Sequence, residues 1–164
     1  VIAAINGACA GIGMVQALMC DVRFAAAGAK FTTAFARRGL IAEYGMSWLL
    51  PRLVGTANAL DVLLSGRVFL AEEAHQMGMV NGVVPADQLL AHAVAYASDL
   101  AANVSPTSMK VMKQQVYADT TQAITESEQR ALVLMKESLT RADFKEGVAS
   151  FMEKRPPQFA PVTR

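Results

Sequence analysis

The sequence predicts an α/β fold in which a half made of short strands, tight turns and helices is followed by an all-helical half. Two observations predict this division. Residues 1–84 contain apolar runs of strand length that are separated by glycine-containing turns. Residues 85–164 contain long stretches in which apolar side chains recur at helical spacing, with charged side chains on the opposite face. We therefore expect two successive regions with different architectures.

The first region begins with residues 1–5, an apolar run that predicts a short buried strand. A glycine-rich turn follows, and a helix is expected to start near Gly11. Similar signals predict the remaining elements of this region. They are strands over residues 21–27, 30–33 and 82–84, and helices over residues 45–54, 56–64 and 72–77. Pro51 is expected to bend or end its helix, because a proline inside a helix removes a backbone hydrogen bond.

The second region is predicted to consist of helices over residues 85–102, 106–118, 121–140 and 143–154. Pro85 and Pro106 are expected to lie in the first turn of the first two helices. A proline costs little there, because the N–H group that it lacks would have no acceptor within the helix. The third helix carries an apolar stripe opposite charged residues, which is typical of a helix that packs on one face.

Composition and charge exclude several classes of protein. Of the 164 residues, 53% are apolar and 18% are charged, which is a globular composition. Fifteen basic and 14 acidic residues give a net charge of +1, so we expect no nucleic-acid partner. The hydrophobic N-terminal third is interrupted by Asp21, Arg23 and Lys30 before it reaches the roughly 18 residues that a membrane span requires. We therefore expect no membrane partner either.

Two further features concern the compartment and the start of the chain. Cys9 and Cys20 have neither metal-binding nor redox spacing, so we expect no metal site and a reducing compartment such as the cytoplasm. The chain opens at Val1 within a strand-like run, without an initiator methionine or the basic start of a signal peptide. We therefore expect it to be a piece of a longer protein.

The glycine-rich turn over residues 7–13 is the first candidate functional motif. It stands between a predicted strand and a predicted helix, so that amides at the helix start can hold an anion or a developing oxyanion. Gln16 occupies the place of the third glycine of a dinucleotide fingerprint, which excludes that motif. A tight turn with a purely structural role fits the same spacing, and the turn alone does not decide between the two interpretations.

Glu43 is the second candidate, because it is an acid within an apolar stretch that is bracketed by Gly39 and Gly45. Apolar surroundings disfavour the charged form of a carboxyl group, which is one way in which proteins make a general base. The alternative is that Glu43 caps the helix expected to begin near Gly45, where the helix dipole favours an acid. Both interpretations remain open at this point.

Four motifs follow one another along nearly the whole chain. They are VIAAINGACAGIGMVQALMCDVRFAAAGAKF, RRGLIAEYGMSWLLPRLVG, LLSGRVFLAEEAHQMGMVNGVVP and EGVASFMEKRPPQF. Together they resemble the crotonase superfamily, the enoyl-CoA hydratases and isomerases. The resemblance implies that residues 1–84 form the C-terminal part of a spiral β–β–α core, whose N-terminal strands and helices lie outside this sequence. It also implies that residues 85–164 form a helical region for oligomerisation, as a homotrimer or hexamer, and for covering coenzyme A.

The resemblance implies a function in acyl-CoA chemistry, as in fatty acid metabolism and β-oxidation. The family polarises a thioester carbonyl with two backbone N–H groups, the oxyanion hole. By position, one of these is the amide of Ile12, with Gly11 and Gly13 shaping the turn, and the other lies outside the sequence. Coenzyme A is then part of the substrate, and no other cofactor is expected.

The acid and base positions distinguish among members of the superfamily. The two glutamates that hold water in the hydratases correspond to Val15 and Phe35 here, so standard hydration is not expected. Glu43 matches the acid that isomerases use to shift a double bond. Val15 and Phe35, together with Tyr44 and Trp48, would then form the acyl pocket.

The resemblance also assigns two residues to the coenzyme. Phe151 and Lys154 match positions that meet the adenine and phosphate groups of coenzyme A.

The resemblance leaves other functions open. The alternatives to an isomerase are an enoyl-CoA hydratase and an acyl-CoA-binding member without catalytic activity. The orientation of Glu43, toward the pocket or toward solvent, separates an isomerase from a member that only binds.

Overall fold

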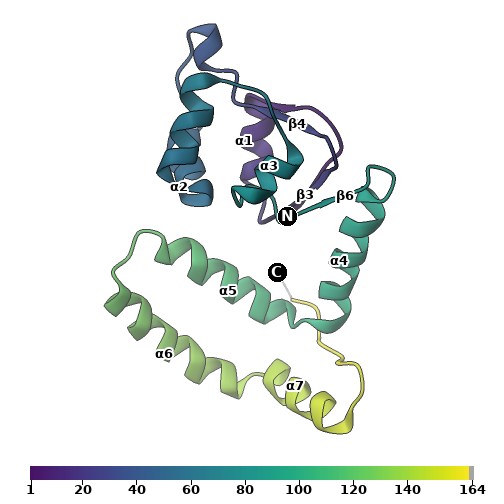
Figure 1. Ribbon diagram of the computed structural model, residues 1–164. Coiled ribbons are helices and arrows are strands. Elements are labelled where there is room, and N and C mark those ends of the chain that lie inside the picture. Colours follow the sequence, from purple (N-terminus) through teal and green to yellow (C-terminus); the bar gives the residue numbers. More distant parts are fainter. Residues whose placement is uncertain (163–164) are drawn as a thin grey trace. The chain divides into compact units, whose positions relative to one another are not determined.

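The computed structural model describes residues 1–162, and the chain divides into two compact units with a boundary between Ala95 and Tyr96 (Figure 1). The first unit mixes strands and helices, and the second is helical, which is the order that the sequence predicts. The boundary falls inside a helix, C-terminal of the predicted division after residue 84. No helix within residues 1–162 has both the length and the apolarity needed to cross a membrane.

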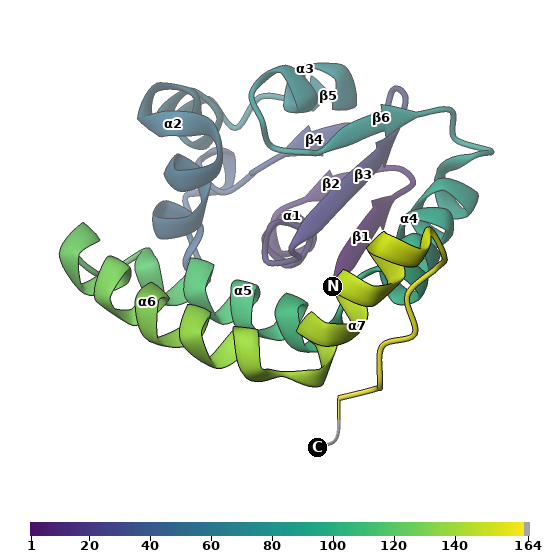
Figure 2. The same ribbon diagram turned by 90° about the horizontal axis from the view of Figure 1, so that it is seen from below.

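The strands of the first unit form two three-stranded sheets. One sheet is parallel throughout, in the order β1–β3–β6, and its strands are β1 (Ile2–Ile5), β3 (Val22–Ala26) and β6 (Gly82–Val84) (Figure 2). The other has the order β2–β4–β5, and its strands are β2 (Cys9–Ala10), β4 (Lys30–Thr32) and β5 (Phe69–Leu70). β4 runs parallel to β2 and antiparallel to β5. The four predicted strands are confirmed, while β2 and β5 were not predicted.

The helices of the first unit are α1 (Ile12–Leu18), the 3₁₀-helix η1 (Ala36–Arg38), α2 (Met46–Ser65) and α3 (Ala71–Gln76). α2 covers both helices that were predicted on either side of Gly55. Gly55 has a φ of 77° and kinks the helix, because a left-handed φ interrupts regular helical geometry. The interruption lies there and not at Pro51, which is accommodated inside α2.

The helix after β6 begins later than the sequence predicts. α4 spans Leu89–Asn103, and the N–H of Gln88 donates to the carbonyl of Pro85 at 2.9 Å. Residues 85–88 therefore form a turn before the helix, and the expectation that Pro85 lies in the first helical turn is wrong. Pro106 does occupy that position in α5 (Pro106–Asp119), where Ser105 is the N-cap and accepts the N–H of Ser108 at 3.0 Å.

The second unit continues with α6 (Ile124–Thr140) and α7 (Ala142–Glu153), and α6 packs against both α5 and α7. Lys154 ends α7 with a φ of 54°. Each of the predicted helices of this region is present, with ends shifted by a few residues.

The hydrophobic core lies in the first unit. Its largest fully buried side chains come from strands, helices and loops alike, and include Phe31, Met14, Leu18, Met46, Leu50 and Met79. The core also holds a buried cation, Arg23 on β3, which is 7% exposed. The Arg23 guanidinium donates to the carbonyls of Met79 at 2.7 Å and Cys20 at 2.5 Å. These bonds tie β3 to the segments that follow α1 and α3.

Candidate active site

A cavity of about 420 Å³ opens in the first unit, and three separate segments of the chain line it. The first is the turn before α1, the second follows β4, and the third lies between η1 and α2. The lining residues are Ala10, Gly11 and Ile12, then Thr33, Ala34 and Phe35, then Arg38, Leu40, Glu43 and Tyr44.

The first segment is shaped by Gly11, whose φ of 51° and ψ of −124° are conformations that glycine alone adopts readily. The N–H of Gly11 donates to the carbonyl of Thr32 on β4 at 3.1 Å. The Gly11 carbonyl accepts the amides of Met14 at 3.0 Å and Val15 at 3.1 Å, which closes the first turn of α1. The amide of Ile12 has no acceptor among the described residues and stands at the cavity.

The second segment turns sharply after β4. Thr33 is fully buried, and its hydroxyl donates to the carbonyl of Val62 on α2 at 2.8 Å. Ala34 has a φ of 58°, and its N–H donates to the hydroxyl of Thr32 at 3.1 Å. A positive φ at an alanine is strained, and the contacts on either side hold it in place. The turn directs the chain so that Phe35, which is 5% exposed, lines the cavity.

The third segment carries the candidate acid. The Phe35 carbonyl accepts the amides of Arg38 at 2.9 Å and Leu40 at 3.0 Å, which fixes the loop that leaves η1. Before α2, Tyr44 and Gly45 are both left-handed, with φ values of 52° and 79°. The carbonyl of Glu43 accepts the N–H of Met46 at 3.0 Å, and α2 has no hydrogen bond from a capping side chain. The Glu43 side chain therefore does not cap α2 through a hydrogen bond.

Glu43 is one of the residues that line the cavity. Glu43 is partly buried, and its carboxylate forms neither a hydrogen bond nor an ion pair within residues 1–162. An acid that lines a cavity and has no internal partner is available to a ligand. A general base needs such availability, since it must reach the proton that it removes.

The structure brings together five of the residues named from the sequence. These are Gly11, Ile12, Phe35, Glu43 and Tyr44. Val15 is 2% exposed within the hydrophobic core, and Trp48 is 43% exposed on α2 beneath the guanidinium of Arg52, 4.0 Å from the ring centre. Gly13, Val15 and Trp48 are not among the lining residues.

Sequence reasoning missed several lining residues, and Arg38 is the most consequential of them. Among the described residues that line the cavity, Arg38 is the only cation and Glu43 is the only acid. Both stand in the motif RRGLIAEYG, and that proximity in sequence was the available signal. Arg38 is exposed, and its Nη1 donates to the carbonyl of Ala34 at 3.3 Å.

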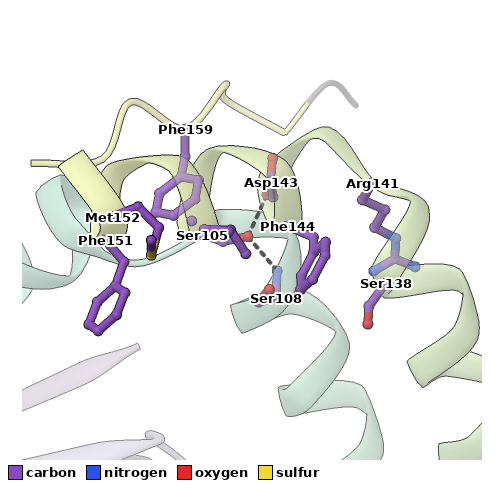
Figure 3. A pocket seen from close by; sticks show the side chains of 11 residues that line it. Ser105, Ser108, Ser138, Arg141, Asp143, Phe144, Phe151, Met152 and Phe159 are labelled. Carbon is purple, nitrogen blue, oxygen red and sulfur yellow. Dashed lines mark hydrogen bonds between the residues drawn. The ribbon is translucent and has the colours of Figure 1, made fainter.

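A second cavity, of about 480 Å³, lies in the second unit (Figure 3). Aromatic and apolar side chains from α7 and the C-terminal segment dominate it, among them Phe144, Phe151, Met152 and Phe159. Ser105 is buried at its edge and donates its hydroxyl hydrogen to Asp143 while it accepts from Ser108. Phe151, predicted to meet coenzyme A, is 81% exposed here. Lys154 lies outside the lining.

The strands, the turn before α1 and the helical second unit together make the crotonase-like α/β fold. A solved enoyl-CoA hydratase from Polaromonas sp. JS666 matches 97% of this chain and 62% of its own, with a TM-score of 0.91 and 31% identity. A solved enoyl-CoA hydratase EchA12_1 from Mycobacterium marinum is 66% identical over 74% of this chain and 61% of its own, with a TM-score of 0.68.

The profile of the enoyl-CoA hydratase/isomerase family matches residues 1–161. The chain belongs to this family. Among its curated relatives, the 1,2-epoxyphenylacetyl-CoA isomerase of Escherichia coli K12 is 38% identical over 160 residues, which cover 97% of this chain and 60% of the relative. The enoyl-CoA hydratase ACTT3 of Alternaria alternata is 36% identical over 162 residues, or 96% of this chain and 53% of the relative. The chain thus spans little more than half the length of these relatives.

Proposed function

We propose that this chain forms part of an enoyl-CoA isomerase that shifts a double bond by proton transfer through Glu43. One observation carries the proposal. Glu43, whose carboxylate has no partner among residues 1–162, lines the same cavity as Ile12 and the turn that carries the Ile12 amide. A base and an oxyanion donor on one cavity are the two groups that proton abstraction beside a thioester requires.

The proposed reaction uses the same base twice. The thioester carbonyl of a 3-enoyl-CoA accepts a hydrogen bond from the Ile12 amide, which makes its α-proton more acidic. Glu43 takes that proton, and the electron pair spreads over a dienolate whose negative oxygen the amide stabilises. Glu43 then returns the proton to the γ-carbon, and the product is the 2-enoyl-CoA. Phe35 and Tyr44 line the cavity and would limit access of water to the acyl group.

The proposal is tested by replacing Glu43 with glutamine. Glutamine keeps the shape of the side chain but cannot accept the proton, so kcat for 3-hexenoyl-CoA should fall by about 10²–10⁴-fold while affinity for the thioester changes little. Glu128→Gln is a matched control, because Glu128 is an exposed acid on α6 and lines neither cavity. If Glu43→Gln keeps most of the parent kcat, another group transfers the proton and the role proposed for Glu43 is wrong. If the parent protein binds the thioester but does not isomerise it, the protein is a member that binds acyl-CoA without this chemistry.

Hydration is the second candidate activity, and the structure gives a reason to expect little of it. Val15 and Phe35, at the positions that the resemblance assigns to water-holding glutamates, are 2% and 5% exposed and apolar. Neither can position or activate water. We therefore expect the full-length protein to hydrate crotonyl-CoA at a rate near background in an assay for 3-hydroxyacyl-CoA. Robust formation of that product would identify a hydratase in which other groups hold the water.

The remaining parts of the proposal concern the second unit, the cellular compartment and the cofactor. We propose that α4–α7 contribute contacts between subunits of a homotrimer or hexamer, and that Phe151 and Lys154 meet the adenine and phosphate groups of coenzyme A. The proposed compartment is reducing, such as the cytoplasm, and Cys9 and Cys20 are both free thiols. Coenzyme A is part of the substrate in this proposal, which invokes no other cofactor.

A further inference from the structure

The cation that lines the candidate active site, Arg38, differs in its contacts from Arg67 and Arg155. Arg67 contacts the carboxylates of Asp61 and Glu73, and Arg155 contacts Glu146 and Glu153. Arg38 has no carboxylate within ion-pair distance among residues 1–162. Within the same residues, the guanidinium makes one hydrogen bond, to the Ala34 carbonyl, which is long at 3.3 Å. Most of the five N–H donors of this guanidinium therefore remain available.

Arg38 and Glu43 line one cavity without forming an ion pair. The other lining side chains are apolar or uncharged, and include Leu40, Phe35 and Tyr44. A substrate that fills this cavity thus meets the Arg38 guanidinium and the Glu43 acid in otherwise uncharged surroundings.

The physical consequence depends on what the substrate places beside Arg38. An alkyl group would displace water from the guanidinium and offer no hydrogen bond in return, and leaving a charged group unsatisfied is costly. A carboxylate would replace that water with a charge-assisted and often bidentate contact. An unpaired polar group in a binding site therefore discriminates strongly between substrates that can and cannot engage it.

We propose that Arg38 is a specificity-determining residue that binds a carboxylate on the acyl group, so that the preferred substrates are CoA thioesters of dicarboxylic acids. This inference rests on the proposed acyl-CoA site. It does not depend on the isomerase step, because recognition of the carboxylate takes place in the bound complex whether or not a proton moves.

The test measures equilibrium binding to the full-length protein by calorimetry. The probes are saturated thioesters, which cannot be isomerised: succinyl-, adipoyl- and suberoyl-CoA, each compared with the alkyl acyl-CoA of the same chain length. We expect the dicarboxylic thioester to bind at least tenfold more tightly at one length or more. Arg38→Gln should remove that preference, and Arg38→Lys should keep part of it because the charge remains while the planar fork is lost.

Arg37→Gln is the matched control. Arg37 precedes Arg38 on the same 3₁₀-helix, but its Nε donates to the Ser65 carbonyl at 2.8 Å and it does not line the cavity. The control makes the same change in net charge and should keep the preference for the carboxylate. The melting temperatures of Arg38→Gln, Arg38→Lys and Arg37→Gln verify that each variant is folded. If Arg37→Gln loses the preference for the carboxylate as fully as Arg38→Gln does, the assignment of that preference to Arg38 is wrong.

The phosphates of coenzyme A are the other anionic groups that Arg38 could meet, and pantetheine thioesters separate the two sources because they lack the nucleotide phosphates. If Arg38→Gln weakens alkyl and dicarboxylic CoA thioesters equally and leaves pantetheine thioesters unchanged, Arg38 binds a phosphate and the proposal is wrong. Equal affinity of the parent protein for alkyl and dicarboxylic thioesters at every length would also overturn it. If the protein prefers the dicarboxylic thioesters but does not isomerise 3-hexenoyl-CoA, the proposed reaction is wrong and the proposal for Arg38 still stands.

Discussion

The two units of this chain differ in their internal packing. The first buries large side chains from strands, helices and loops in one hydrophobic core. In the second, no hydrophobic side chain of residues 96–162 is buried, and the buried residues there are Ser105 and Ser150. Apolar side chains of its helices stay exposed instead, such as Val116, Ile124 and Met152. A helix whose apolar face has no internal partner gains most of its stability by packing on something else.

The contrast explains where the candidate active site can be built. A base and an oxyanion donor must be held in fixed geometry, and rigid supports come from well-packed elements. Gly11 is hydrogen-bonded to β4, and Thr33 is fully buried against α2. The strained conformations at Ala34 and Tyr44 persist because these neighbouring contacts hold them. The second unit offers less internal support, which is consistent with its proposed role in contacts between subunits.

The largest structural effect is expected at the buried cation of the first unit. Arg23→Met removes the donor that satisfies the carbonyls of Met79 and Cys20. Each buried acceptor left unsatisfied costs roughly 1–3 kcal/mol, so the variant should lose about 3 kcal/mol of stability. Hydrogen exchange followed by mass spectrometry should show faster exchange in β3 and β6 than in α5–α7.

An exposed arginine supplies the control for that measurement. Arg52→Met removes a cation from the surface of α2, where its Nη1 donates to the Trp48 carbonyl at 2.8 Å, and stability should change by about 0.5 kcal/mol or less. If Arg23→Met and Arg52→Met had equal effects, the stability of the first unit would not depend on its buried cation.

The sequence predicted the order of the elements well because most of them are long enough to carry a pattern. β2 and β5 have two residues each, too few for a period of two to be recognised. Pro85 is equally compatible with a first helical turn and with the turn it forms, and only the Gln88 hydrogen bond decides between them. The break in α2 was expected, and its location at Gly55 follows from the left-handed φ.

The candidate site was predictable in part, for a related reason. Gly11 and Glu43 stand out in sequence because each residue type is unusual in its surroundings. The placement of Val15 in the core depends on which face of α1 is buried, and that is a property of tertiary packing. Arg38 resembles many surface arginines in sequence, and its place at the cavity without an ion pair among the described residues is a property of the tertiary structure.

A second prediction concerns the turn on which the site depends. Gly11→Ala would place a Cβ 3.9 Å from the Thr33 carbonyl oxygen, so space is sufficient, but φ of 51° with ψ of −124° is strained for alanine. Strain of this kind costs about 1–3 kcal/mol. The melting temperature should fall, and relaxation of the turn should displace the Ile12 amide and lower kcat as well.

The neighbouring glycine offers a contrast within the same turn. Gly13 lies inside α1, has no positive φ, and a Cβ built there meets nothing within 4 Å. Gly13→Ala should therefore raise the stability of the protein by about 0.5–1 kcal/mol, because alanine restricts the unfolded chain and favours helix. A lower melting temperature for Gly13→Ala than for Gly11→Ala would show that the φ of Gly11 does not determine the turn.

The smallest effect is expected in the second unit, where an ion pair near the end of α7 responds to pH. The Arg155 guanidinium and the amide of Gln158 hold the pKa of Glu146 at about 2, below its ordinary value of 4.5. Because this pKa is lowered on folding, the stabilisation is present above pH 4.5 and is lost as the pH falls toward 2. Exchange in α7 of the parent should accelerate over this interval. In Glu146→Gln, the part of that acceleration caused by Glu146 should disappear, whereas Glu128→Gln should behave like the parent.

The effect of Glu146→Gln should be small because the ion pair is close to solvent and exposed ion pairs contribute little. If the parent and Glu146→Gln had the same pH dependence, the ion pair would contribute nothing to α7, and packing alone would hold the end of the helix.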